Sequence, residues 1–159
     1  MKSRGIIAII AAIMLAAFLA GCSSSEDVPQ AAEDEIALQI QLDVKEDIGL
    51  LVIDADIDGA KTSGGISNAD KSVLKHDELL YWSFNKQEYG NPADTVNLAI
   101  KFKVITEYCD PNYENIYPEE LTVPLDEISF KADFGETYFV TITGDKESGY
   151  KAELQNTKK

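Results

Sequence analysis

Apolar and polar residues alternate along most of the chain after residue 35. Every second residue is apolar in 36–44, 96–104, 138–142 and 150–154, and a period of two is typical of strands with one buried face. The predicted strands are 36–44, 50–58, 79–84, 96–104, 128–132, 138–142 and 150–154, with 121–123 as a candidate eighth. We therefore expect an all-β chain.

The spacing of these segments indicates how they are organised. No segment carries a sustained 3.6-residue apolar stripe with helix caps, and polar turn residues separate the segments regularly. For about 120 residues of this kind, one antiparallel β-sandwich of seven to eight strands is the economical arrangement. Leu98 and Val140 fall on predicted inward positions, and Trp82 and Phe84 share a strand face with Leu80 and are expected in the core.

A short motif favours one kind of sandwich. Gly135-Glu136-Thr137-Tyr138 at the start of a late strand is similar to the Gly-x-Tyr motif of immunoglobulin-like and fibronectin-like domains, with one residue more in the spacing. The resemblance covers fewer than ten residues. It implies an immunoglobulin-like topology in which the Tyr138 hydroxyl bonds back to the preceding turn.

The first 22 residues differ from the rest. Lys2 and Arg4 precede an almost unbroken apolar run over residues 5–18, which is shorter than the ~20 residues that a membrane-spanning helix needs. The run ends in Leu19-Ala20-Gly21-Cys22, which resembles the lipobox of bacterial lipoproteins. The resemblance implies cleavage before Cys22 and a covalent diacylglycerol and acyl lipid on that cysteine, and two or three such chains anchor a protein stably. The alternative is an ordinary secretory signal with a coincidental cysteine.

The expected organisation is therefore a cleaved lipoprotein signal peptide (1–21), a flexible tether (22–34) and a β-sandwich domain (35–159). The tether is assigned on its small, polar and charged residues. The signal and the lipid predict a cell-envelope, extracytoplasmic location, with the protein attached to the membrane through Cys22.

Charge limits the classes of partner. The chain has 14 basic and 28 acidic residues, and removal of the segment with Lys2 and Arg4 leaves 12 against 28, a net charge of −16. Nucleic acid would be repelled by such a surface. The charge is interpreted as a means of solubility for an anchored β-protein; a cationic partner or a divalent metal is the alternative. With Cys22 lipidated, Cys109 stands alone, so no intramolecular disulfide is expected, and two neighbouring acids favour a packed cysteine over a nucleophile.

Asp54, Asp56 and Asp58, followed by Gly59, have the opening spacing of an EF-hand calcium loop. The twelfth position, where a bidentate glutamate belongs, is Gly65. The three acids also fit the outward positions of a strand, where on a sheet edge they would discourage pairing with other chains. They are candidate metal ligands, but the sequence favours the solvated edge and predicts no metal or cofactor other than the lipid.

Catalytic chemistry finds little support. His76, the only histidine, lies between Lys75 and Asp77 and is expected in a solvated turn, since no recognisable nucleophile motif or second histidine accompanies it. We expect a protein that is not an enzyme and has no catalytic residues, although a hydrolase that uses carboxylate pairs remains an open alternative.

Two predicted loops are candidates for recognition. Residues 108–118 contain Tyr108, Tyr113 and Tyr117 among Asn, Asp and Pro, and residues 59–77 form the longest predicted connection. Loops on a rigid scaffold commonly carry binding, although the tyrosines also suit a cover over one end of the sandwich. The sequence thus predicts a non-enzymatic module for a protein, peptide or glycan ligand, with a structural or accessory subunit of a larger envelope complex as the alternative.

Overall fold

The computed structural model describes residues 30–107 and 118–155, and these residues form an all-β structure with two short 3-10 helices. The elements are β1 (Glu35–Val44), β2 (Leu50–Ile57), β3 (Ala60–Ile66), β4 (Leu79–Asn85), η1 (Lys86–Tyr89), β5 (Thr95–Ile105), η2 (Glu119–Leu121), β6 (Thr122–Pro124), β7 (Ile128–Asp133), β8 (Thr137–Asp145) and β9 (Gly149–Gln155). None of the described helices is long and apolar enough to cross a membrane.

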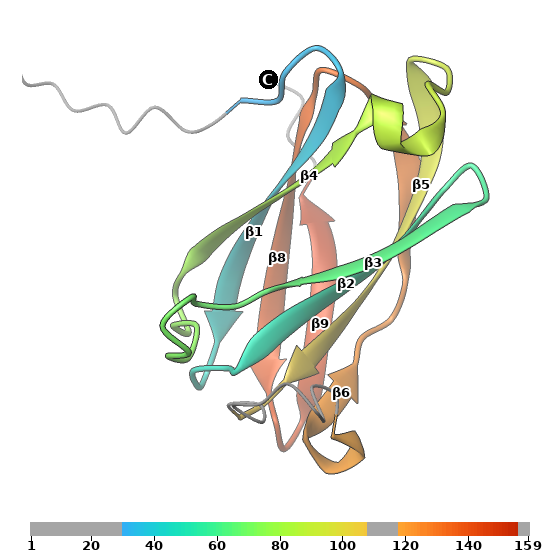
Figure 1. Cartoon of the computed structure of the whole chain (residues 1–159). Helices are drawn as coiled ribbons and strands as arrows, with labels where there is room; N and C mark the ends of the chain where they lie inside the picture. The colour runs from blue at the N-terminus through green and yellow to red at the C-terminus, as the bar shows by residue number, and fades with distance from the viewer. Residues whose placement is uncertain (1–29, 108–117, 156–159) are drawn as a thin grey trace, which may run out of the picture.

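The strands form two sheets that face each other (Figure 1). One has four strands in the order β4-β1-β8-β9; the other has five, in the order β3-β2-β5-β6, with β7 also paired to β5. The expectation of a purely antiparallel structure is wrong at one place, because β1 and β8 run parallel. A parallel pair needs a long connection, and here the whole intervening chain supplies it.

One hydrophobic core fills the space between the sheets. The alternation predicted from the sequence is confirmed: Ile36, Leu38, Ile40 and Leu42 of β1 are each 0% exposed. Leu98 in β5 and Val140 in β8 are buried in the same cluster. Both sheets therefore have equivalent apolar inner faces, and their burial is the main stabilising contribution.

The strand missing from the sequence prediction is β3, which occupies the first half of the predicted 59–77 loop. It forms a hairpin with β2 through Asp58 and Gly59, whose φ values of 48° and 92° are both positive. Two-residue hairpin turns of this kind favour Asp-Gly because glycine adopts positive φ without strain. Ser, Gly and Lys in β3 hide the strand signal, but the Asp-Gly pair could have revealed it.

Aromatic residues close one open side between the sheets. As expected, Phe84 is buried and Trp82 is partly buried against the core. Their rings meet edge to face at 6.4 Å, and Phe84 contacts Tyr89 of η1 in the same way at 6.3 Å. Gly64 of β3 makes room for the indole: a Cβ on Gly64 would lie 2.4 Å from the Trp82 ring.

Two local contacts bear on other expectations. The backbone N–H of Asp133 donates to the Tyr138 hydroxyl at 2.7 Å, so the tyrosine bonds back to the preceding turn as predicted. Near the start of the domain, Ala31 N–H donates to Thr137 Oγ1 and Lys86 N–H donates to the Asp34 carbonyl. Residues 31 and 34, which the sequence places in the tether, are thus bonded to the domain.

Candidate functional site

The outer surfaces of the two sheets are the places where strands present side chains to solvent. We call the outward residues of the five-stranded sheet the charged face: Asp54, Asp56, Lys61, Ser63, Asn97, Ala99, Lys101, Lys103, Ser129 and Lys131. We call a set on the four-stranded sheet the uncharged face: Ala37, Gln39, Gln41, Leu79, Tyr81, Ser83, Thr137, Phe139, Thr141 and Thr143. Register places each set side by side.

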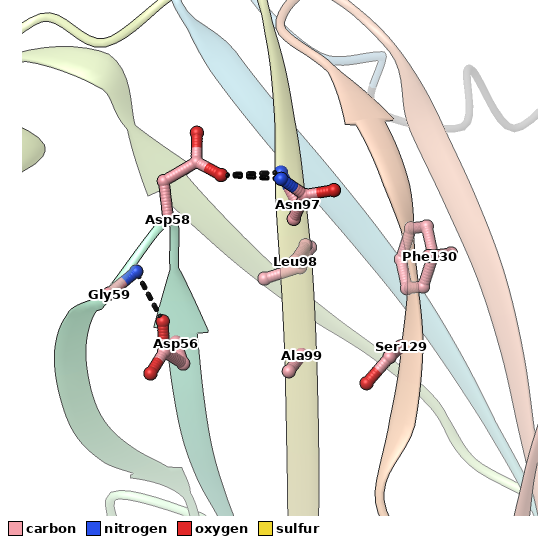
Figure 2. A pocket seen from close by; sticks show the side chains of 8 residues that line it. All are labelled: Asp56, Asp58, Gly59, Asn97, Leu98, Ala99, Ser129 and Phe130. Atoms are coloured by element: carbon pink, nitrogen blue, oxygen red, sulfur yellow. Dashed lines mark hydrogen bonds between the residues drawn. The ribbon is translucent and has the colours of Figure 1, made fainter.

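The charged face is hollowed around Ala99. Its small side chain lies opposite Asp56 on β2 and opposite Ser129 on β7. Two open hollows of about 550 and 510 Å³ adjoin there, and both include Asp56 and Ala99. Figure 2 shows the first, which is lined by Asp56, Asp58, Gly59, Asn97, Leu98, Ala99, Ser129 and Phe130.

The three candidate metal ligands bind different partners in their own chain. Asp54 pairs with Lys103 Nζ at 2.6 Å and accepts a bond from the Ser63 hydroxyl at 2.6 Å. Asp56 accepts from Gly59 N–H at 2.6 Å. Asp58 accepts from the backbone N–H of Asn97 at 3.0 Å and from its side-chain amide at 2.8 Å, as Figure 2 shows. In the described residues, no group of three or more His, Cys, Asp or Glu side chains is placed to hold a metal ion.

The hydrogen bonds also lower the pKa of two of these acids, Asp54 and Asp58. Partial burial alone would raise the pKa of Asp54, but the bonds from Lys103 and Ser63 outweigh it and lower the pKa. The two bonds from Asn97 lower the pKa of Asp58. Contacts within the fold therefore favour the ionised form of the Asp54 and Asp58 carboxylates.

The expectation that these acids guard a sheet edge is wrong. β2 lies inside the five-stranded sheet, between β3 and β5. Asp54 faces Lys101 across the β2–β5 pair, and Asp56 faces Lys61 across the β2–β3 pair. The strand β3, which was not predicted, pairs with the side of β2 that would otherwise be the sheet edge. The acids therefore lie between strands that present lysines opposite them.

His76 lies in an exposed turn, as expected, and is tied to Asp47. Its Nδ1 lies 2.9 Å from Asp47 Oδ1, and its backbone N–H donates to the same oxygen at 3.0 Å. Lys75 Nζ bonds the other oxygen at 2.8 Å. The hydrogen bond to Asp47 raises the pKa of His76, and bonds from Lys75 and His76 lower the pKa of Asp47. The cluster joins the β1–β2 connection to the segment before β4.

Several predicted sites lie outside the described residues. These are the lipidation site Cys22, the lone Cys109, and the recognition tyrosines Tyr108, Tyr113 and Tyr117. In the other predicted recognition segment, the part after β3 is held by local bonds: Asn68 Nδ2 donates to the Val73 carbonyl, and the Ser72 hydroxyl donates to Asp70.

The uncharged face is the surface that the sequence analysis missed. Tyr81, Gln39 and Phe139 lie in one row across β4, β1 and β8. Tyr81 is 45% and Leu79 is 37% exposed, and these are the exposed large apolar residues of the described chain. Phe139 is partly exposed. The signal was present: in predicted strands, Tyr81 and Phe139 occupy outward positions where polar residues are usual.

Polar groups on this face differ in their partners. Gln39 is only 3% exposed, although it lies on an outward position between Tyr81 and Phe139. Gln41 Nε2 donates to the carbonyls of Leu42 and Asp77 at 2.9 Å. The hydroxyls of Tyr81, Thr141 and Thr143 make no side-chain hydrogen bond to another described residue.

A small hollow of about 200 Å³ opens on the uncharged face beside Tyr81. It is lined by Gln30, Glu35, Ala37, Leu38, Tyr81, Trp82 and Ser83. Ala37 lies opposite Ser83 on β4 and opposite Thr137 on β8. As at Ala99, small side chains on adjacent strands leave room that longer ones would fill.

The fold and the two faces define the protein's class as an all-β, two-sheet protein with contrasting outer surfaces. No protein-family model matches the chain, and no curated protein matches it. Among solved structures it is similar to intermedilysin in a structure with human CD59 (TM-score 0.36, 14% identity, 78% of this chain and 24% of that chain). Pneumolysin is similar with a TM-score of 0.34 and 11% identity, over 81% of this chain and 24% of that chain. The membrane-binding domain of pneumolysin is similar with a TM-score of 0.33 and 11% identity, over 79% of this chain and 97% of that chain. The chain spans about a quarter of the length of intermedilysin and of pneumolysin, and these likenesses are too low to assign a function.

Proposed function

We propose that this protein is a lipid-anchored, extracytoplasmic binding module that is not an enzyme and that binds its ligand through the uncharged face. The observation that carries the proposal is an uncharged surface, with exposed Tyr81 and Leu79, on a chain of net charge −14. The acids on the outer side of the same sheet, Glu35, Asp43 and Glu153, lie around this set of residues rather than within it. Exposed aromatic residues among hydrogen-bonding groups are characteristic of binding surfaces.

Binding, rather than catalysis, is supported by how the reactive groups are used. Asp54, Asp56 and Asp58 accept bonds from their own chain, and His76 and Asp47 tie two connections together. A general base must be placed to accept a proton from a bound substrate. The carboxylates and the imidazole named here are instead hydrogen-bonded within the protein, where they stabilise the fold.

We also propose that the domain is immunoglobulin-like in a broad sense. Two packed sheets and the Tyr138 hydroxyl bond support this. The strand orders of the two sheets differ from those of an immunoglobulin constant domain, so the likeness concerns the layers and the tyrosine rather than the connectivity.

The alternative function, an accessory subunit docked on an envelope complex, is favoured by one observation. β3 is an edge strand of the described five-stranded sheet and carries a single charge, Lys61. Edge strands can accept an added strand from a partner.

Anchoring is tested on the full chain made in bacterial cells. We expect the mature protein to begin at Cys22, to carry acyl chains by intact-mass measurement, and to partition into detergent. Cys22→Ala should remain unprocessed or unlipidated. A water-soluble product without acyl chains would contradict the anchor.

The binding surface is tested by photo-crosslinking. A photoreactive amino acid placed at position 81 should give a ligand adduct in cells, while the same residue at position 131 on the charged face should not. Equal adducts at both positions would contradict the uncharged face. A third variant carries the photoreactive residue at position 61 on β3, and an adduct confined to that variant would favour docking through β3.

A further inference from the structure

We infer that the uncharged face binds a neutral glycan chain, with one sugar seated in the hollow beside Tyr81. The inference rests on the proposed function and names the ligand class. Ala37, Tyr81 and Ser83 line that hollow, and Phe139 lies two strands away from Tyr81 in the same row.

Charge selects the kind of ligand. The residues of the face include no ionisable acid or base except the Tyr81 phenol. Charged residues surround them: Glu35 borders the hollow at one end, Asp43 lies opposite Thr143 at the other, and Glu153, paired with Lys151, lies opposite Thr141 on β9. Anionic polymers would be repelled by the acids of this rim, and the central row of Tyr81, Gln39 and Phe139 offers a cationic ligand no carboxylate to pair with. An uncharged ligand is the complementary one.

The side chains match sugar chemistry. A pyranose ring has an apolar C–H face and a rim of hydroxyl groups. The Tyr81 ring can stack against the C–H face, and the hydroxyls of Thr141 and Thr143 can exchange hydrogen bonds with the rim, because neither has a side-chain partner among the described residues. Tyr81 and Phe139 are two strand spacings apart, roughly 9–10 Å, about the length of a disaccharide.

Size distinguishes a glycan from a protein partner. The face covers three strands and four rows of residues, a footprint of roughly 300 Å² from the usual strand spacing and rise. A stable protein interface buries about 800 Å² on each partner, with clustered aromatic or Arg anchors at its centre. Tyr81 and Leu79 are the only large apolar residues of the described chain that are exposed. A few sugar units fit this area, whereas a protein would also have to cover the acidic rim.

Affinity electrophoresis tests the inference on the full chain in neutral detergent. The acidic chain migrates in native gels, so a neutral polysaccharide in the gel retards it in proportion to binding. The probes are hydroxyethylcellulose, glycol chitin and pullulan, with polygalacturonate as the anionic comparison. We expect retardation by at least one neutral probe and none by polygalacturonate.

Two matched substitutions locate the site. Ala37→Leu fills the hollow on the uncharged face, and Ala99→Leu makes the same change on the charged face. We expect Ala37→Leu and Tyr81→Ala to weaken binding tenfold or more and Ala99→Leu to leave it unchanged, with circular dichroism to verify that each variant is folded.

Contrary outcomes separate the two proposals. If no neutral probe retards the chain, or Tyr81→Ala binds as well as the wild type, the glycan inference is overturned. If a protein then crosslinks to position 81 and not to position 131, the binding module stands with a different ligand. If neither occurs, both proposals fail.

Discussion

The two sheets have similar inner faces and opposite outer ones. Leu98 in the five-stranded sheet and Val140 in the four-stranded sheet are each 1% exposed in the same core. Outside, Asp54 pairs with Lys103 on one face, whereas Tyr81 and Phe139 lie on the other in a row whose register partners, Gln39 and Gln155, are uncharged. The core requires apolar residues in both sheets, whereas outward positions are not constrained by the core, and the proposed binding role rests on the difference between the outer faces.

The faces also differ in how their polar groups are used. On the charged face, carboxylates accept bonds from lysine, serine, asparagine and the backbone. On the uncharged face, the hydroxyls of Tyr81, Thr141 and Thr143 have no side-chain partner among the described residues. A hydrogen bond already made within the chain contributes to stability, and a group without a partner can contribute to binding.

The largest expected effect tests the equivalence of the inner faces. Leu98→Asp and Val140→Asp should each unfold the protein, because a buried charge without a partner costs several kcal/mol against a total stability of about 5–15 kcal/mol. Circular dichroism measures the loss. The outward neighbours Ala99→Asp and Thr141→Asp should stay folded; unfolding of these controls as well would contradict the inward and outward assignment.

The next effect concerns the contact that joins the edges of the two sheets. Gly64→Ala should lower the free energy of unfolding by about 1–3 kcal/mol, the usual cost of overpacking, because its Cβ would overlap the Trp82 ring. Urea unfolding followed by the fluorescence of Trp82, the single tryptophan, measures it.

A double-mutant cycle provides the control for Gly64. In a Trp82→Leu background, Gly64→Ala should cost much less, since the ring that it would strike is gone. Equal costs in both backgrounds would show that the indole does not occupy the space above Gly64.

A smaller effect separates the charged face from the uncharged one. Lys103→Met should cost about 0.2–1 kcal/mol, typical of a partly exposed ion pair, and the cost should shrink in about 1 M salt, where the screening length is ~3 Å. The pKa of Asp54 is lowered in the folded protein, so the stabilisation is present above the ordinary pKa of aspartate and is lost as pH falls through the lowered value. Urea unfolding at several pH values and salt concentrations measures both.

Thr141→Val is the matched change on the uncharged face. Its effect on stability should show no dependence on salt or on acid pH. A dependence equal to that of Lys103→Met would remove the electrostatic distinction between the faces.

The smallest effect lies on neither face. Because the pKa of His76 is raised by its bond to Asp47, the NMR signal of this single histidine should titrate above the ordinary value of about 6.5. The associated stabilisation is present below the ordinary pKa and is lost as pH rises through the raised value. Asp47→Asn should return the pKa of His76 toward the ordinary value; an unshifted titration in the wild type would contradict the Asp47 contact.

The sequence alone determined which residues face inward. Alternation at residues 36–44 and 96–104 predicted β1, β5 and their buried positions, since a strand exposes alternate residues whatever its neighbours are. The turn-back bond of Tyr138 was predicted from a local motif and is confirmed, because its partner Asp133 is only five residues away. The lipid anchor at Cys22 stays a prediction from the N-terminal sequence.

The tertiary structure decided which strands are neighbours. It placed β2 inside its sheet, paired β1 with β8 in parallel, and brought Tyr81, Gln39 and Phe139 into one row. These residues are separated by about 40 to 100 positions in the chain, and local periodicity contains no information on the pairing of distant strands. The candidate site therefore could not be predicted from the sequence. The sequence indicates which single positions face outward, but only the pairing of distant strands brings those residues together as one surface.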